Sequence, residues 1–177
     1  MERDDRWRAV HAAVSARVPA DDRETDARAR FLADLERLPF PFSEDADPTH
    51  VTASAIVVGS RGTVLHVHRR TGAWLQPGGH VEASEAPPDA ALRETMEETG
   101  LSVRHPDTGP YLIHVDVHDA PRGHVHLDLR YLLLAPDDDP APAPGESQVA
   151  RWFTWDEADD VADESLRNAL RAARARA

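Results

Sequence analysis

The segment GGHVEASEAPPDAALRETMEETGL, residues 78–101, carries the strongest structural pattern in this chain. It contains a Gly-Gly pair, an isolated Glu85 and, after two prolines, a short run in which acidic residues crowd together. Proline is tolerated in the first turn of a helix, and glycine is favoured just after the last turn. The segment therefore predicts a helix from about Pro88 to Thr99, followed by Gly100 in the left-handed conformation.

Three carboxylates lie close together on this predicted helix. Glu94 and Glu98 are i,i+4 neighbours, Glu94 and Glu97 are i,i+3 neighbours, and like charges at these spacings destabilise a helix by roughly a few tenths of a kcal/mol. They also lie near the C-terminal end, where the helix dipole disfavours anions. A hard divalent cation with oxygen ligands would remove both conflicts. A solvated acidic face is the alternative for these residues taken alone.

The other side of the predicted helix carries apolar or small residues. With about 100° per residue, we expect this side to pack on a sheet and the three glutamates to lie on the opposite side. The packing residues are Pro88, Ala91, Leu92, Thr95 and Thr99.

The chain around this segment predicts a sheet. Residues 52–59 and 63–69 read as the two strands of a hairpin, and Pro77-Gly78-Gly79 predicts a sharp turn. The remaining predicted elements are strands at 111–118, 123–135 and 152–155, a Pro- and Asp-rich loop at 136–145, and a terminal helix at 163–175.

Residues 1–46 predict a helical arm before an α/β domain that spans residues 47–177. The first helix ends before Pro19, and Asp21 or Asp22 caps the second. We expect the arm to pack on the domain or to form a homodimer contact, with a lid over the substrate as the alternative. The apolar positions at helical spacing are Trp7, Val10, Val14 and Val18 in the first helix, and Phe31, Leu32, Leu35 and Leu38 in the second.

Composition excludes several classes of protein. The chain has 177 residues, no cysteine and a formal net charge of −12. Without cysteine there is no disulfide, thiolate metal site or cysteine nucleophile. The negative charge, with no Lys/Arg cluster, disfavours nucleic-acid binding, and no apolar run approaches the roughly 20 residues of a membrane span. The N-terminal residues show no signal-peptide pattern, so we expect a cytoplasmic protein.

The spacing of residues 79–101 resembles the Nudix box, the signature of the MutT-like Nudix hydrolase family. The pattern is Gly, five residues, Glu, seven residues, then Arg-Glu-U-X-Glu-Glu-X-Gly-U, where U is a bulky aliphatic residue. This chain departs from it only at Thr95. The resemblance covers roughly residues 50–160. It implies an α/β/α sandwich with a mixed central sheet, preceded here by the helical arm. It also implies a metal-dependent enzyme that acts on acid anhydrides in phosphorus-containing substrates and cleaves a nucleoside diphosphate linked to another group X.

The resemblance further implies roles for box residues, with Mg²⁺ as the cofactor and Mn²⁺ as a substitute. Glu94 would orient or deprotonate the attacking water, and Arg93 would pair with Glu85 to hold the helix to the preceding loop. The acidic ligand or base outside the box is open between Glu146, Asp116 and Asp128, and we favour Glu146. The implied catalytic residues are Glu85, Arg93, Glu94, Glu97 and Glu98, and the implied metal ligands are Gly79, Glu94, Glu97, Glu98 and Glu146.

Residues outside the box select the substrate in this family, and the sequence leaves X open. Polar residues alternate along the two strands after the box, so each set shares one strand face. We expect a polar pocket wall or a solvent-facing side there, with a zinc site as the alternative. A catalytically silent nucleotide-sensing module is the alternative to an enzyme, and the intact box argues against it. The alternating residues are His114, Asp116 and His118, then His124, His126, Asp128 and Arg130; the predicted substrate contacts are Arg69, Gln76, Gly79, His126 and Asp128.

Overall fold

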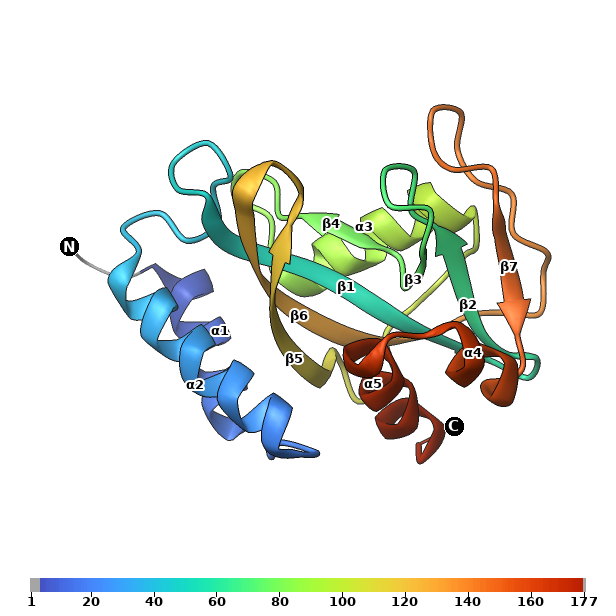
Figure 1. Cartoon of the computed structure of the whole chain (residues 1–177), viewed down its shortest axis with the longest axis horizontal. Coiled ribbons are helices and arrows are strands. Elements are labelled where there is room, and N and C mark those ends of the chain that lie inside the picture. Colours follow the sequence, from blue (N-terminus) through green and yellow to red (C-terminus); the bar gives the residue numbers. More distant parts are fainter. Residues whose placement is uncertain (1–3, 177) are drawn as a thin grey trace.

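The computed structural model describes residues 4–176, in which seven strands form one mixed sheet (Figure 1). The strands are β1 (Thr49–Gly59), β2 (Gly62–Val67), β3 (Trp74–Leu75), β4 (Gly78–His80), β5 (Tyr111–Ala120), β6 (His124–Leu134) and β7 (Ala150–Phe153). Their order is β3-β2-β1-β6-β5, and β4 pairs with β1 while β7 pairs with β2. β1 and β6 are parallel, whereas β2 and β5 run antiparallel to their neighbours.

Helices cover both faces of the sheet. α3 (Pro87–Thr99) packs on one face, and α4 (Trp155–Val161) and α5 (Glu164–Arg174) pack on the other. α1 (Asp5–Ala16) and α2 (Asp22–Arg37) lie next to β5, at the left of Figure 1. The predicted α/β/α sandwich with a mixed central sheet and a preceding helical pair is confirmed. No helix within residues 4–176 combines the length and the apolar character needed to cross a bilayer.

Side-chain alternation along β1 divides the sheet into its two faces. The odd-numbered residues 51–57 join a core cluster with α1, α2 and α3, and residues 56 and 58 join a second cluster with α4 and α5. Earlier even-numbered positions on that second face hold His50, Thr52 and Ser54, which are polar although they are buried. The face under α5 is therefore apolar at one end of β1 and polar at the other, and the polar end holds the candidate pocket.

A buried carboxylate attaches the helical pair to the edge of the sheet. Glu24 in α2 is fully buried, pairs with Arg17 at 2.7 Å, and accepts a hydrogen bond from the backbone N–H of Val115 at 3.1 Å. Val115 lies in the edge strand β5, whose outward N–H groups have no strand partner. Glu24 thus satisfies a donor that the sheet leaves free, and the arm packs on the domain as expected. The homodimer contact stays a prediction.

Four local predictions were wrong. The last strand, predicted at 152–155, ends at Phe153, and Trp155 begins α4. α1 ends at Ala16 and Val18 is 77% exposed, because a residue before proline is driven out of the helical conformation. The predicted sharp turn at Gly78-Gly79 is instead the short strand β4, paired with β1. The second hairpin strand begins at Gly62 and ends at Val67. The predicted arm began at residue 1 and the domain ended at residue 177; residues 1–3 and 177 lie outside the described residues.

Candidate functional site

The ends of α3 are set by the residues that the sequence indicated. Pro87 and Pro88 stand in its first turn, and Gly100 follows its last residue with φ 70°. A side chain at position 100 would also collide with the backbone of Ala141, so both conformation and space require glycine there. These residues fix where the acidic end of the helix lies.

The packing face of α3 differs in part from the prediction. Thr95 and Thr99 are fully buried as expected, and their hydroxyls donate to the carbonyls of Ala91 and Thr95 at 2.6 and 2.5 Å. Thr95 therefore replaces the usual aliphatic residue without leaving a buried hydroxyl unpaired. Pro88 and Leu92 are only partly buried, and Pro87 and Ala90 take the buried positions instead.

Glu94 and Glu98 face the strand β4. This strand covers the side of α3 on which the glutamates were predicted. The backbone N–H of Gly78 donates to Glu98 Oε2 at 2.8 Å. A Cβ at Gly79 would lie 2.5 Å from Glu94 Cδ, so glycine is what allows the strand to approach the carboxylate. The Glu97 side chain is 46% exposed, against 17% for Glu94 and 13% for Glu98.

Burial dominates the electrostatics of these two carboxyl groups. It raises the pKa of Glu98 to about 8, with further increases from nearby Glu94, Glu146 and Glu97. Burial also raises the pKa of Glu94, although Arg93 opposes the change. His66 Nε2 lies 3.5 Å from Glu98, but burial lowers the pKa of His66 to about 4. The neutral imidazole therefore cannot offset the charge of Glu98.

Arg93 joins the helix to the loop before it. Its Nε and Nη2 donate to the two oxygens of Glu85 at 2.9 and 3.0 Å, and Nη2 also donates to the carbonyl of His80 at 3.0 Å. Burial favours the neutral form of Glu85, but the hydrogen bonds from Arg93 outweigh it and lower the pKa of this carboxyl group. The predicted pair of Arg93 and Glu85 is present.

The donor set at the box suits a hard divalent cation. Glu94 and Glu98 offer largely buried oxygens beside a backbone that only glycine permits. Glu146 is close enough to raise the pKa of both. Such oxygen ligands match Mg²⁺ or Mn²⁺. Arg93 Nη1 stands between Glu94 and Glu97, at 2.7 and 3.4 Å from their oxygens. Within residues 4–176, the only side chains that bring three or more possible metal-ligand atoms within 4.8 Å of one another are a group of four histidines. The carboxylates of the box do not reach this spacing.

A cavity of about 370 Å³ opens on the polar face of the sheet, beside β4. Gln76, Gly79, His126 and Asp128, four of the predicted substrate contacts, line it. Arg69 is not among the lining residues, and its guanidinium donates to the carbonyl of Gly145 instead. The cavity and the carboxylates therefore both adjoin the Gly78–Gly79 strand, although Glu94, Glu97 and Glu98 are not among the residues that line the cavity.

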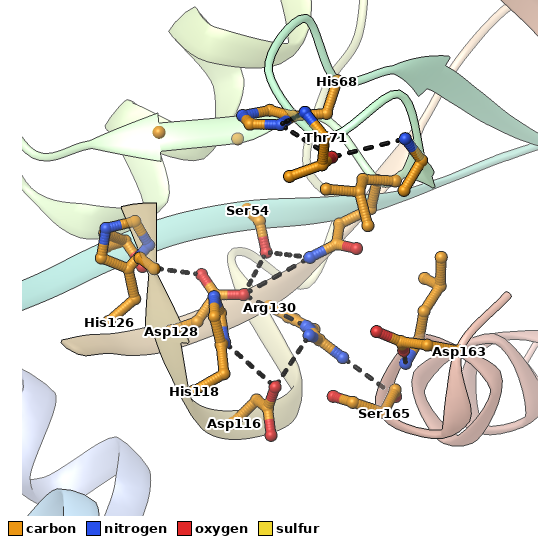
Figure 2. A pocket seen from close by; sticks show the side chains of 18 of the residues that line it. Ser54, His68, Thr71, Asp116, His118, His126, Asp128, Arg130, Asp163 and Ser165 are labelled. Atoms are coloured by element: carbon orange, nitrogen blue, oxygen red, sulfur yellow. Dashed lines mark hydrogen bonds and ion pairs between the residues drawn. The ribbon is translucent and has the colours of Figure 1, made fainter. Parts of the chain in front are cut away.

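Asp128 lies at the centre of this cavity (Figure 2). It accepts hydrogen bonds from Thr52 Oγ1 at 3.1 Å and Ser54 Oγ at 2.8 Å, both from β1. Arg130 Nε donates to the same carboxylate at 3.1 Å, and its Nη1 donates to the carbonyl of Ser165 in α5 at 2.9 Å. A single guanidinium thus links the sheet to the terminal helix across the pocket.

Asp116 is the second buried carboxylate of the cavity and stands opposite Asp128 in the β5–β6 register. Arg130 Nη2 donates to it at 3.1 Å, and Arg23 from the helical arm reaches it at 3.2 Å. Burial opposes ionisation of Asp116, but hydrogen bonds and charge from His118 and Arg130 outweigh it, and the pKa is lowered. The carboxylate is therefore charged and paired, as a buried charge requires.

One prediction outside the box can be compared with this geometry. The alternating polar residues of β5 and β6 do share faces, since His114 pairs with Arg130 and His118 with His126 in the register. Sequence reasoning missed Arg23, which lies 93 positions from its partner and follows no local pattern. It also missed Thr52 and Ser54, whose period-two spacing in a strand could have indicated a polar face.

Comparison with known proteins gives consistent results. A family model described as NUDIX domain matches residues 48–173. The MutT-like protein of Streptomyces ambofaciens is 32% identical over 120 residues, which cover 66% of this chain and 72% of that protein. The Probable DHNTP pyrophosphohydrolase of Lactococcus lactis subsp. cremoris is 36% identical over 90 residues, 47% of this chain and about half (52%) of the relative's length. The crystal structure of a NUDIX-family hydrolase from Clostridium perfringens aligns with a TM-score of 0.60 and 28% identity, over 70% of this chain and 93% of that one.

Proposed function

This chain belongs to the Nudix hydrolase family, and from that premise we propose a metal-dependent enzyme that cleaves the diphosphate linkage of a nucleoside diphosphate joined to another group X. The class of enzyme, a Nudix-type pyrophosphohydrolase, follows from the family match and the named relatives. One observation supports the finer proposal most strongly. The polar cavity and the buried carboxylates share one short strand, Gly78–His80, so a ligand in the cavity would extend its phosphates toward the box.

Residues of the box would hold the cofactor. Glu94, Glu97 and Glu98, with Gly79 and Glu146, are the proposed ligands of Mg²⁺ or Mn²⁺. When bound, this ion would neutralise charge on the diphosphate and lower the pKa of water. The donor chemistry supports the proposal, since Glu94 and Glu98 are oxygen donors whose pKa values are raised by burial. Among the described residues, no buried cationic side chain lies close to Glu98.

The remaining roles belong to protein side chains. Glu94 would orient the attacking water and accept its proton, and its raised pKa brings it closer to the range in which a general base works best. Arg93, held by both oxygens of Glu85, would fix the helix against the loop and thereby position Glu94. Glu85 and Arg93 are then positioning residues in the proposed reaction.

The cavity would bind the nucleoside or the X group through Gln76 and Asp128. Asp128 is fixed by hydroxyl and guanidinium donors from three sides, so it offers a rigid acceptor for N–H or O–H groups of a ligand. A base or sugar that donates two hydrogen bonds fits this wall better than an apolar group. Polar groups held rigidly in this way give specificity, because a ligand without matching donors leaves their remaining acceptor positions unpaired.

A screen with Mg²⁺ tests the proposal. The substrates are nucleoside triphosphates, sugar nucleotides, dinucleoside polyphosphates, ADP-ribose and DHNTP, the last because of the name of the Lactococcus lactis relative. We expect one class to be cleaved at its diphosphate linkage into a monophosphate and the phosphorylated X group, or into a monophosphate and pyrophosphate for a triphosphate, with both products separated by chromatography. Turnover should fall by orders of magnitude in Glu98→Gln with the fold intact, and near-normal turnover in that variant would contradict the role of the box. No cleavage of any substrate would favour the nucleotide-sensing alternative.

The other properties of the protein are also proposals. We propose a small-molecule substrate and no nucleic-acid partner, which the formal net charge of −12 supports. The family match begins at residue 48, which supports a boundary between a helical arm at 1–46 and a catalytic domain at 47–177. A cytoplasmic location and a homodimer remain hypotheses, to be tested by cell fractionation and by light scattering.

A further inference from the structure

Four histidines converge at the end of the sheet where β1 and β6 begin. They come from three strands: His50 from β1, His80 from β4, and His124 and His126 from β6. One side-chain nitrogen from each lies within 4.8 Å of those of the other three. The ring of His50 is central, with its centroid 5.0 to 5.2 Å from those of the other three rings. Only His124 and His126 are close in the sequence, two residues apart on β6, so the folding of the sheet brings His50 and His80 to this pair.

The central histidine has a nitrogen without a partner. His50 is only 1% exposed, and its Nδ1 lies 3.2 Å from the carbonyl of Asp47. Its Nε2 is buried with no hydrogen-bond partner among the described residues. A buried polar atom without a partner is costly and uncommon in folded proteins. Because Nδ1 contacts the backbone carbonyl, Nε2 is the nitrogen that remains to coordinate a metal. Metal-binding histidines show this arrangement.

A second histidine of the group is approached by an outer carboxylate. His80 Nε2 lies 3.5 Å from Glu44 Oε2. The contact is not a hydrogen bond, since His80 Nε2 has no hydrogen-bond partner among the described residues, but it puts a carboxylate where carboxylates orient the imidazole ligands of metals. His124 and His126 stand on one side of β6, two residues apart, as neighbouring ligands on a strand should.

From this cluster we propose a transition-metal site of the Zn²⁺ type, formed by His50, His80, His124 and His126 and distinct from the carboxylates of the box. Four imidazoles suit zinc and similar borderline ions, and they do not suit Mg²⁺ or Ca²⁺. A tetrahedral ion with bonds of 2.0–2.1 Å would hold the nitrogens about 3.3–3.4 Å apart. Rotation of the partly exposed rings of His80, His124 and His126 closes the set around His50.

The site would stabilise the strand β4, which carries Gly78 and Gly79. His80 follows Gly79 directly, and the carbonyl of His80 accepts a hydrogen bond from Arg93 at 3.0 Å. Binding at His80 would therefore tie β4 to β1 and β6 on one side of the strand while Arg93 holds it on the other. His126 also lines the cavity, at the left of Figure 2. As a metal ligand it would shape the cavity wall, and its metal-binding nitrogen would not contact the substrate.

Metal titration of the full chain tests the site independently of the proposed hydrolysis. After chelator treatment, the protein is titrated calorimetrically with Zn²⁺ in the presence of saturating Mg²⁺. We expect one Zn²⁺ per chain, and Co²⁺ in its place should give the intense visible absorption of tetrahedral coordination. His50→Gln and His124→Gln should each weaken Zn²⁺ binding by at least about 100-fold, since loss of an outer-shell partner alone costs 10–100-fold. His124 is partly exposed, so its variant should fold even if the His50 variant does not.

Two control variants distinguish this site from other zinc ligands. Glu98→Gln removes a box carboxylate and should leave Zn²⁺ binding unchanged. His11→Gln removes a histidine of α1, outside the cluster, and should also leave it unchanged. The proposal is overturned if no stoichiometric Zn²⁺ binds, if Co²⁺ gives only the weak spectrum of octahedral coordination, or if Glu98→Gln abolishes Zn²⁺ binding while His124→Gln retains it. In those cases the histidines are a polar wall only.

Discussion

Replacing Glu98 with glutamine should change how the stability of the protein depends on pH. The Glu98 side chain is 13% exposed, and its pKa is raised from 4.5 to about 8 chiefly by burial. Between these values the folded protein keeps a proton that the unfolded chain has released. The folded state therefore binds more protons, and its stability falls as the pH rises through this interval.

The magnitude follows from the shift. Each pH unit in the interval removes about 1.4 kcal/mol from the free energy of unfolding, so the whole interval removes at most about 5 kcal/mol. Glutamine has no proton to lose, and its amide can still accept the hydrogen bond from the N–H of Gly78. We therefore expect Glu98→Gln to be close to the parent protein in stability at pH 5 and more stable than it by several kcal/mol at pH 8.

The assay is urea unfolding with chelator present, followed by tryptophan fluorescence between about pH 5 and pH 8.5. Glu97→Gln is the matched control, because it makes the same chemical change at a neighbouring carboxylate that is half exposed to water. Parallel stability profiles for the parent protein and Glu98→Gln would refute the reasoning. Mg²⁺ at pH 8 should stabilise the parent protein more than the variant, since Glu98 is a proposed ligand.

Three further changes test other parts of the structure. Gly79→Ala places a Cβ 2.5 Å from the Glu94 carboxyl carbon. Displacing that carboxyl group by about 1 Å should lower kcat by about 100-fold, which steady-state kinetics measure. The midpoint of thermal unfolding should change little, as a melting curve would show. Arg130→Met removes the guanidinium that two buried carboxylates share, and only Asp116 keeps another, from Arg23; the change should cost about 3–5 kcal/mol in urea unfolding. Arg104→Met, at an exposed ion pair, should cost no more than about 0.5 kcal/mol, and similar losses in the two variants would contradict the assignment. Glu24→Gln leaves the Arg17 guanidinium without its charged partner and should cost about 1–3 kcal/mol, with faster amide exchange at the edge of β5 as the site-specific signature.

The sequence predicted the box helix well because its determinants are local. Proline at its start, Gly100 at its end and small residues at Ala91, Thr95 and Thr99 act within the segment itself. Periodicity and capping describe this helix well, so the structure changed only its details. The pairing of Arg93 with Glu85, eight residues apart, was implied by the resemblance to the Nudix box.

The pocket could be predicted only in part, because its geometry depends on contacts between distant segments. Period-two spacing placed Asp128 and Arg130 on one face of a strand, as the structure has them. It could not show that β4 would form a strand across the acidic side of α3 and bury Glu98 against Gly78. The convergence of four histidines from three strands likewise needs the register of β1, β4 and β6, which no single segment contains.

The guanidinium of Arg23 in the pocket wall has a consequence for how such enzymes diversify. It reaches Asp116 from α2, outside the residues 48–173 that match the family model. A segment outside the matched family domain thus supplies part of the cavity wall. Exchange or loss of that segment could redirect the choice of substrate during evolution while every residue of the box stays the same.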